Sequence, residues 1–104
     1  VLEQLGRVVD SVRSRAMFGG VGIYSHDHFF ALISKDVVYF KVDDETRPDY
    51  VARGMGPFQP GGPSTPAMHG YYELPSELLE DVDELRPWVE RSLTLAKRKG
   101  RTAR

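Results

Sequence analysis

The apolar residues at the start of the chain recur with the period of a helix. Leu2, Leu5, Val8, Val9 and Val12 are spaced by three or four residues. This spacing places them on one side of a helix, so it predicts an amphipathic first helix over residues 2–12.

Three apolar runs of strand length follow, at residues 15–24, 29–33 and 37–42, and polar turns separate them. Residues 29–33 are apolar on both faces, which is typical of a central strand. The third run alternates, with Val38, Phe40 and Val42 on one face and Val37, Tyr39 and Lys41 on the other. Because the connections are short, the three strands are expected to be antiparallel neighbours.

A second helix is expected to begin at Thr46, with Thr46 and Asp49 as reciprocal caps, and to end at Gly54. Prolines and glycines then dominate residues 55–66, which predicts a loop with a short strand near Phe58. Residues 67–74 resume as a strand.

The last third of the chain carries a helical stripe. Ser76 is expected to cap a short helical turn. Pro87 lacks the N–H that a helix interior needs, so the main helix is expected to start near Asp83 or to kink at the proline. The stripe has spacings of three and four residues and comprises Leu78, Val82, Leu85, Val89, Leu93 and Ala96.

Together these elements predict an α+β fold in the order α-β-β-β-α-β-β-α. We expect a two-layer α/β sandwich, in which helices cover one face of a five-stranded antiparallel sheet. At 104 residues and 40% hydrophobic composition, the chain suits a single domain.

Residues 15–24 read R-A-M-F-G-G-V-G-I-Y, an apolar run interrupted by three glycines. Glycine within a strand usually marks a bulge, a bend or the close approach of another backbone. A phosphate-binding loop is the alternative, but its glycine spacing and following helix are absent here. We therefore interpret the run as one bent strand; its motif residues are Arg15, Met17, Phe18, Gly19, Gly20, Gly22 and Tyr24.

The net charge is −1, but basic and acidic residues are distributed unevenly along the chain. Five of the fourteen bases lie in residues 97–104, so residues 1–96 hold nine bases against fifteen acids, a net charge of −6. We therefore divide the chain into a domain over 1–96 and a basic tail over 97–104. The tail is either a solvated helix end or a weak contact for nucleic-acid phosphates through Lys97, Arg98, Lys99, Arg101 and Arg104.

The chain has no cysteine, which excludes disulfides, thiolate catalysis and cysteine-ligated zinc. It has no apolar run long enough to span a bilayer and no secretory leader. These features predict a cytoplasmic protein that does not bind membranes.

The candidate chemistry is sparse, and no cofactor is expected. His26 and His28 flank Asp27, and a metal site there would need a further ligand such as His69; a polar hairpin turn explains the same residues, so no metal is predicted. A hydrolase would require Ser64 or Thr65 with His69 and Glu73, and no catalytic signature supports that set. We predict that the protein is not an enzyme.

Aromatic residues without an expected place in the core indicate function more strongly than the candidate metal or catalytic residues do. If helices cover one face of the sheet, Tyr24, Tyr39, and Tyr71 or Tyr72 have no helical cover on the other. Tyrosine combines an apolar ring with a polar tip, which suits interfaces. Packing beneath the loop over residues 60–66 is the alternative. Lys41, with Arg15, could pair with Asp43 and Asp44 or contact an anion. The predicted partner surface therefore comprises Tyr24, Tyr39, Lys41, Tyr71 and Tyr72.

Three segments in this order resemble the TfoX/Sxy N-terminal domain family: residues 15–24, V-Y-F-K-V-D-D-E-T-R-P at 38–48, and Y-Y-E-L-P-S-E-L-L-E-D at 71–81. The resemblance implies a fold similar to that of type III secretion chaperones and a regulatory role. Named members regulate natural competence alongside a cAMP-responsive transcription activator. They carry a second helical domain, whereas this chain stops at Arg104, so a role in competence is not implied for it.

The leading hypothesis is thus a non-catalytic protein-binding module with a protein partner, able to form a homodimer through a sheet face or edge. A nucleic-acid-associated regulator that uses the basic tail is the second hypothesis. An enzyme of unrecognised type is the third.

Overall fold

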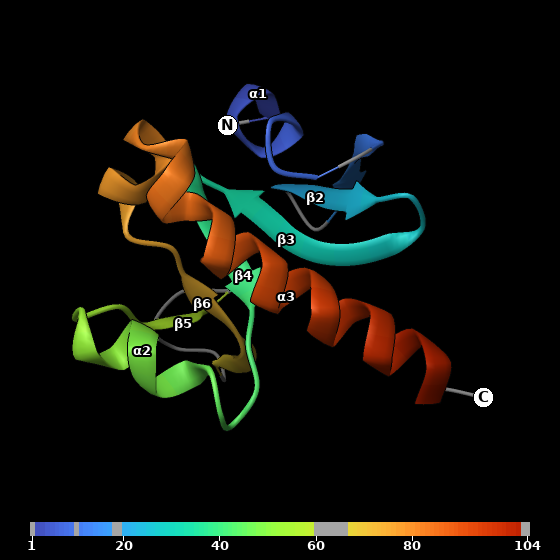
Figure 1. Ribbon diagram of the computed structural model, residues 1–104. Coiled ribbons are helices and arrows are strands. Elements are labelled where there is room, and N and C mark those ends of the chain that lie inside the picture. Colours follow the sequence, from blue (N-terminus) through green and yellow to red (C-terminus); the bar gives the residue numbers. More distant parts are fainter. Residues whose placement is uncertain (1, 10, 18–19, 60–66, 103–104) are drawn as a thin grey trace.

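A six-stranded antiparallel sheet forms the centre of the computed structural model, and a long C-terminal helix runs across one of its faces (Figure 1). The structure describes residues 2–9, 11–17, 20–59 and 67–102. The strand order is β1-β2-β3-β4-β6-β5, so β1 and β5 are the two edges. The predicted α+β architecture is confirmed, with six strands in place of five.

The elements follow the chain as α1 (Leu2–Gly6), β1 (Val12–Met17), β2 (Gly20–Ser25), β3 (His28–Ser34), β4 (Val37–Lys41), α2 (Arg47–Ala52), β5 (Pro57–Phe58), β6 (Met68–Glu73), the 3₁₀ helix η1 (Ser76–Glu80) and α3 (Val82–Thr102). None of the helices in these described parts is both long and apolar enough to cross a membrane.

The core lies between the sheet and α3. Val38 and Phe40 of β4 are buried on this side, while their neighbours along the strand are half-buried on the other, as the alternation predicts. Helices α1 and α2 contribute Leu5 and Tyr50 to the same core, and Tyr50 packs edge-on against Trp88 of α3 at 4.7 Å between ring centroids. All three described α-helices therefore contribute side chains to one core on the same face of the sheet.

The sixth strand arises because residues 12–25 contain two strands, β1 and β2, where the sequence predicts one. Helix α1 ends at Gly6, a turn follows, and Val12 begins β1. Val8 and Val9 pack against the core from the turn. Their helical spacing therefore reflects contact with a common core, and the predicted helix over 2–12 is wrong beyond Gly6.

The glycine-rich run forms two strands and not a single bent one. Met17 of β1 pairs with Gly20 of β2, so the chain reverses direction between them; Phe18 and Gly19 lie outside the described residues. At Gly20 the backbone of β3 comes so close that an added Cβ would lie 2.3 Å from the carbonyl oxygen of Ile33. The close approach expected of a strand glycine is thus present at Gly20.

A register shift at Ile23 and Tyr24 forms a bulge between β2 and β3. Ile23 pairs with Ala31, whereas Tyr24 pairs with Phe29, so β3 has one extra residue between these pairs. Phe30 and Ala31 both enter the core, and Phe29 lies with Tyr24 on the other face. This one irregularity decides which of the two adjacent phenylalanines is buried.

The residues at the N-termini of α2 and η1 do not cap these helices as expected. Thr46 precedes α2 but makes no side-chain cap; instead its N–H and that of Glu45 donate to Asp43 Oδ1, both at 3.0 Å. Gly54 follows α2 with a positive φ of 79°, as predicted. Ser76 lies inside η1 and does not cap it.

Helix α3 is capped by Asp81, whose Oδ1 accepts from the N–H groups of Asp83 and Glu84. The helix therefore begins at Val82, one residue before the predicted start, and continues past Pro87.

Candidate partner-binding surface

The face of the sheet opposite α3 carries a group of aromatic side chains. We call it the aromatic face and define it by Tyr24, Phe29, Tyr39, Lys41 and Tyr71. Each of these residues is half-buried, and each lies on a strand. Three of the four tyrosines in the predicted partner surface are thus found together on one face.

The rings contact one another across strands. Tyr24 and Phe29 have ring centroids 5.1 Å apart, and Phe29 lies 5.6 Å from Tyr71. These separations are typical of favourable aromatic pairs. The contacts join β2, β3 and β6 into one apolar row.

Phe29 is the member that sequence reasoning missed. Its run is apolar on both faces, so the pattern alone does not show which residues face α3. The bulge between β2 and β3 sends Phe29 to the aromatic face, and no local signal marks that bulge apart from the glycines of β2.

Lys41 ends the row at β4. Its ammonium donates a hydrogen bond to the Tyr71 hydroxyl oxygen at 3.2 Å and lies 4.9 Å from the centre of the same ring. Burial lowers the pKa of Lys41 from its ordinary value. The predicted pairing of Lys41 with Asp43 or Asp44 is not among the described contacts; Asp44 pairs with Arg47 at 2.7 Å.

Tyr39 lies nearer the β5 edge, and its ring packs at a tilt against that of Phe58, with 4.8 Å between the ring centroids. Burial, and then the negative charge of its cross-strand neighbour Glu73, raise the pKa of the Tyr39 hydroxyl. Tyr39 therefore stays protonated at neutral pH and can donate a hydrogen bond.

Tyr72 is the exception among the predicted tyrosines. It is only 7% exposed and packs in the core at 6.4 Å from Tyr50. It alternates with Tyr71 along β6, so the two point to opposite faces. Tyr72 therefore does not belong to the aromatic face.

Two arginines of β1 extend the face to the sheet edge. Arg13 pairs with Tyr24 and Arg15 with Gly22, and partners in a sheet share a face. Both arginines are exposed. They line a hollow of about 390 Å³ together with Ser14, Tyr24, His26 and Asp27. The Arg15 of the glycine motif is thus part of a basic hollow beside the aromatic row.

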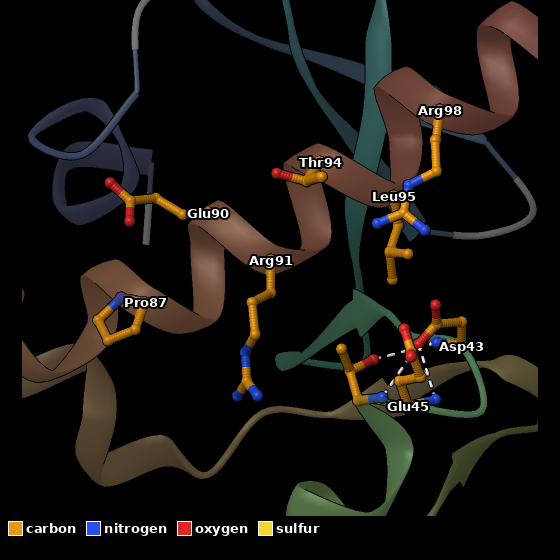
Figure 2. Close-up of a pocket in the computed structure, with 9 residues that line it drawn as sticks. Asp43, Glu45, Pro87, Glu90, Arg91, Thr94, Leu95 and Arg98 are labelled. Carbon is orange, nitrogen blue, oxygen red and sulfur yellow. Dashed lines mark hydrogen bonds between the residues drawn. The ribbon is translucent and has the colours of Figure 1, made fainter.

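A second hollow, of about 480 Å³, lies between α3 and the turn that precedes α2 (Figure 2). Its charged residues have both signs: Asp43, Glu45 and Glu90 against Arg91 and Arg98. Burial alone would raise the pKa of Asp43, but hydrogen bonds from Thr46 and Glu45 and the charge of Arg98 lower it. Arg91 also pairs with Asp49 at 2.5 Å. These contacts connect α2 and its turn to α3, so we interpret this groove as structural.

The remaining candidate residues are not brought together. No group of three or more metal-ligating side chains occurs among the described residues. His69 lies on β6, away from the β2–β3 turn that contains His26, and its carbonyl accepts a hydrogen bond from Arg47. Ser64 and Thr65 lie outside the described residues.

The basic tail begins as a continuation of α3, which runs without interruption to Thr102. Lys97 and Arg98 are exposed, and Arg98 borders the groove beside Asp43. The backbone of Lys99 and Arg101 is helical, and Arg104 lies outside the described residues. The first part of the tail is therefore a helix end.

Two comparisons with known proteins complete this description. A family model described as the TfoX N-terminal domain matches residues 3–96, nearly the whole chain. No curated protein matches the sequence.

Proposed function

Because the chain belongs to the TfoX N-terminal domain family, we propose that it is a non-catalytic regulatory module that binds a protein partner through the aromatic face. The family is not a known enzyme family, and its named members are competence regulators. From the family the proposal takes only a regulatory role, and it does not assign this chain to the regulation of competence.

The observation that carries the proposal is the division of aromatic residues between the two faces of one sheet. Phe30, Phe40 and Tyr50 are at most 2% exposed, whereas Tyr24, Phe29 and Tyr71 are only half-buried, although Phe29 contacts both tyrosines. Aromatic side chains and arginine are enriched in protein interfaces, where an apolar centre is bordered by polar groups. The aromatic face has this composition, with Arg13 and Arg15 at its border.

Site-specific cross-linking tests the proposal. A photoreactive phenylalanine analogue replaces Tyr24 or Tyr71, and the same analogue replaces Arg86, an exposed residue of α3, as the control. In cells of the native host, we expect one discrete protein adduct from each sheet position and none from α3. Equal adducts from all three positions, or none from the sheet positions, would contradict the proposal. An adduct with the mass of a dimer would identify a second copy as the partner.

The exposed bases at the end of α3 favour a second candidate function, weak binding of nucleic-acid phosphates. Lys97 and Arg98 are exposed near the end of α3, where the phosphates of a nucleic acid could reach Lys97, while Arg98 also borders the groove beside Asp43. Titration of labelled duplex DNA with the full chain and with residues 1–96 tests this. Binding that requires the tail and falls steeply with salt supports phosphate binding. Equal binding by the full chain and by residues 1–96 counts against it.

A further inference from the structure

Strand β1 has the features of a site where another chain adds a strand. It is six residues long and lies at one end of the sheet. The other edge, β5, has only two residues. A terminal strand directs the N–H and C=O groups of alternate residues away from the sheet, where an extended segment can pair with them.

This outer edge is accessible within the described part of the chain. Residues 13–16 are all exposed, so both faces of the strand are uncovered over its central part. The described backbone hydrogen bonds from turns and loops include one between the His26 N–H and the Ser11 carbonyl oxygen, but none to residues 12–17. Nothing among the described residues therefore occupies the pairing groups of the edge.

Charge indicates what kind of segment would pair there. Arg13 and Arg15 are two residues apart, so both project on the aromatic face. Neither forms an ion pair or a hydrogen bond with another described residue, and both line the hollow of about 390 Å³. A strand added along β1 would place every second side chain next to these arginines. Acidic residues at alternate positions would pair with them.

A second copy of the chain is a poor occupant by the same reasoning. If two β1 strands paired antiparallel and kept their aromatic faces continuous, the arginines of one copy would lie opposite or diagonal to those of the other. Like charges at such positions destabilise a sheet. The edge strand thus disfavours its own dimer and favours an acidic partner.

We propose that β1 binds an extended, acidic segment of the partner protein by strand addition, with alternate acidic side chains on Arg13 and Arg15. The inference rests on the proposed function, because it names the chemistry of the segment that a protein partner would contribute. The segment's apolar residues on the same face would lie next to Tyr24.

The test uses synthetic peptides and NMR. One peptide alternates glutamate with valine and threonine, a second has lysine in place of each glutamate, and a third has the acidic sequence with a central proline. Each peptide is titrated into the full chain up to millimolar concentration, and the chemical shifts and hydrogen exchange of the backbone amides are measured. We expect only the first peptide to protect amides of β1, because strand addition needs both the charge and the N–H groups of the added strand. The binding should weaken as salt is added.

Matched variants separate the charge effect from a general one. The double variant Arg13→Glu, Arg15→Glu should lose at least about tenfold in affinity for the acidic peptide, the range typical of charge-pair losses, and should gain binding of the lysine peptide. The control variant Arg86→Glu makes one such charge change on α3. It should bind each peptide with the affinity of the unchanged protein. Equal affinity of the double variant, or binding that leaves β1 amides unprotected, would overturn the proposal.

The outcome is separable from that of the cross-linking experiment. Adducts at Tyr24 and Tyr71 without protection of β1 by the acidic peptide would refute strand addition and leave the aromatic face as the binding surface. Protection of β1 without such adducts would support strand addition and refute the aromatic face. If the β1 amides are already protected without peptide and the free chain has the mass of a dimer, an acidic partner at this edge is refuted.

Discussion

The two faces of the sheet contain similar residues and have different roles. On the side of α3, Phe30 and Phe40 have no exposed surface and meet at 6.0 Å between ring centroids. On the aromatic face, Phe29 and Tyr71 meet at a similar distance, 5.6 Å, but are only half-buried. Aromatic contact alone therefore does not identify a core. The layer of helices makes the difference, because it removes one set of rings from water and leaves the other accessible.

The largest difference between the faces should appear on truncation of one ring from each. Phe40→Ala should lower the free energy of unfolding by about 3–5 kcal/mol, because it leaves a cavity in the core. Tyr71→Ala should cost about 1 kcal/mol, since it removes a half-buried aromatic contact. Urea titration followed by the fluorescence of Trp88, the single tryptophan, measures both. Equal losses would mean that the aromatic face is a second core.

A smaller effect is expected where two backbones meet. Gly20→Ala should destabilise the fold by about 1–3 kcal/mol, because the new methyl group would collide with the Ile33 carbonyl. Gly70→Ala is the matched control, since a Cβ there has no neighbour within 4 Å. We expect it to change stability by less than about 0.5 kcal/mol. If both variants melt at the same temperature, the close approach of β3 to β2 does not restrict Gly20.

The core should also respond to alkaline pH. Burial raises the pKa of Tyr50 to about 12, whereas an unfolded chain titrates near pH 10. The folded state thus keeps Tyr50 protonated after the unfolded state has lost the proton. Stability from this group is complete below pH 10 and declines as the pH rises toward 12.

Comparison of the unchanged chain with Tyr50→Phe isolates this contribution. Over that pH interval the unchanged chain should lose about 2–3 kcal/mol more than the variant. Urea midpoints at several alkaline pH values give the difference. Parallel curves for the two proteins would show that Tyr50 does not titrate differently on folding.

The smallest effect is expected for Lys41 on the aromatic face. Lys41→Met removes the hydrogen bond to Tyr71 and the contact with its ring. It also removes the need to bury part of an ammonium group, which offsets the loss. The net change should be below about 1 kcal/mol. A larger loss, measured by the same urea titration, would assign Lys41 a structural role and weaken the view of this face as a binding surface.

Local patterns determined much of this protein. The alternation in residues 37–42 correctly placed Val38 and Phe40 in the core and Tyr39 and Lys41 opposite. The helical stripe located α3, and the glycine motif led to the family. These features depend on neighbours a few residues apart, whose relative directions are set by helix and strand geometry. The sequence therefore predicted the fold class, one face of the sheet and part of the candidate surface.

Tertiary structure alone decided the rest. The strand Val12–Met17 was not predicted as a strand of its own, because Val12 was assigned to the first helix and residues 15–17 to the single bent strand. Its place at the sheet edge depends on pairing with β2. The bulge that directs Phe29 outward depends on the register of β2 against β3. Tyr72 entered the core because α2 and α3 supplied Tyr50 and Trp88 on that side. Each outcome is a competition between distant segments for the same pairing groups and the same buried volume, and the local periodicity of a segment carries no information about its competitors.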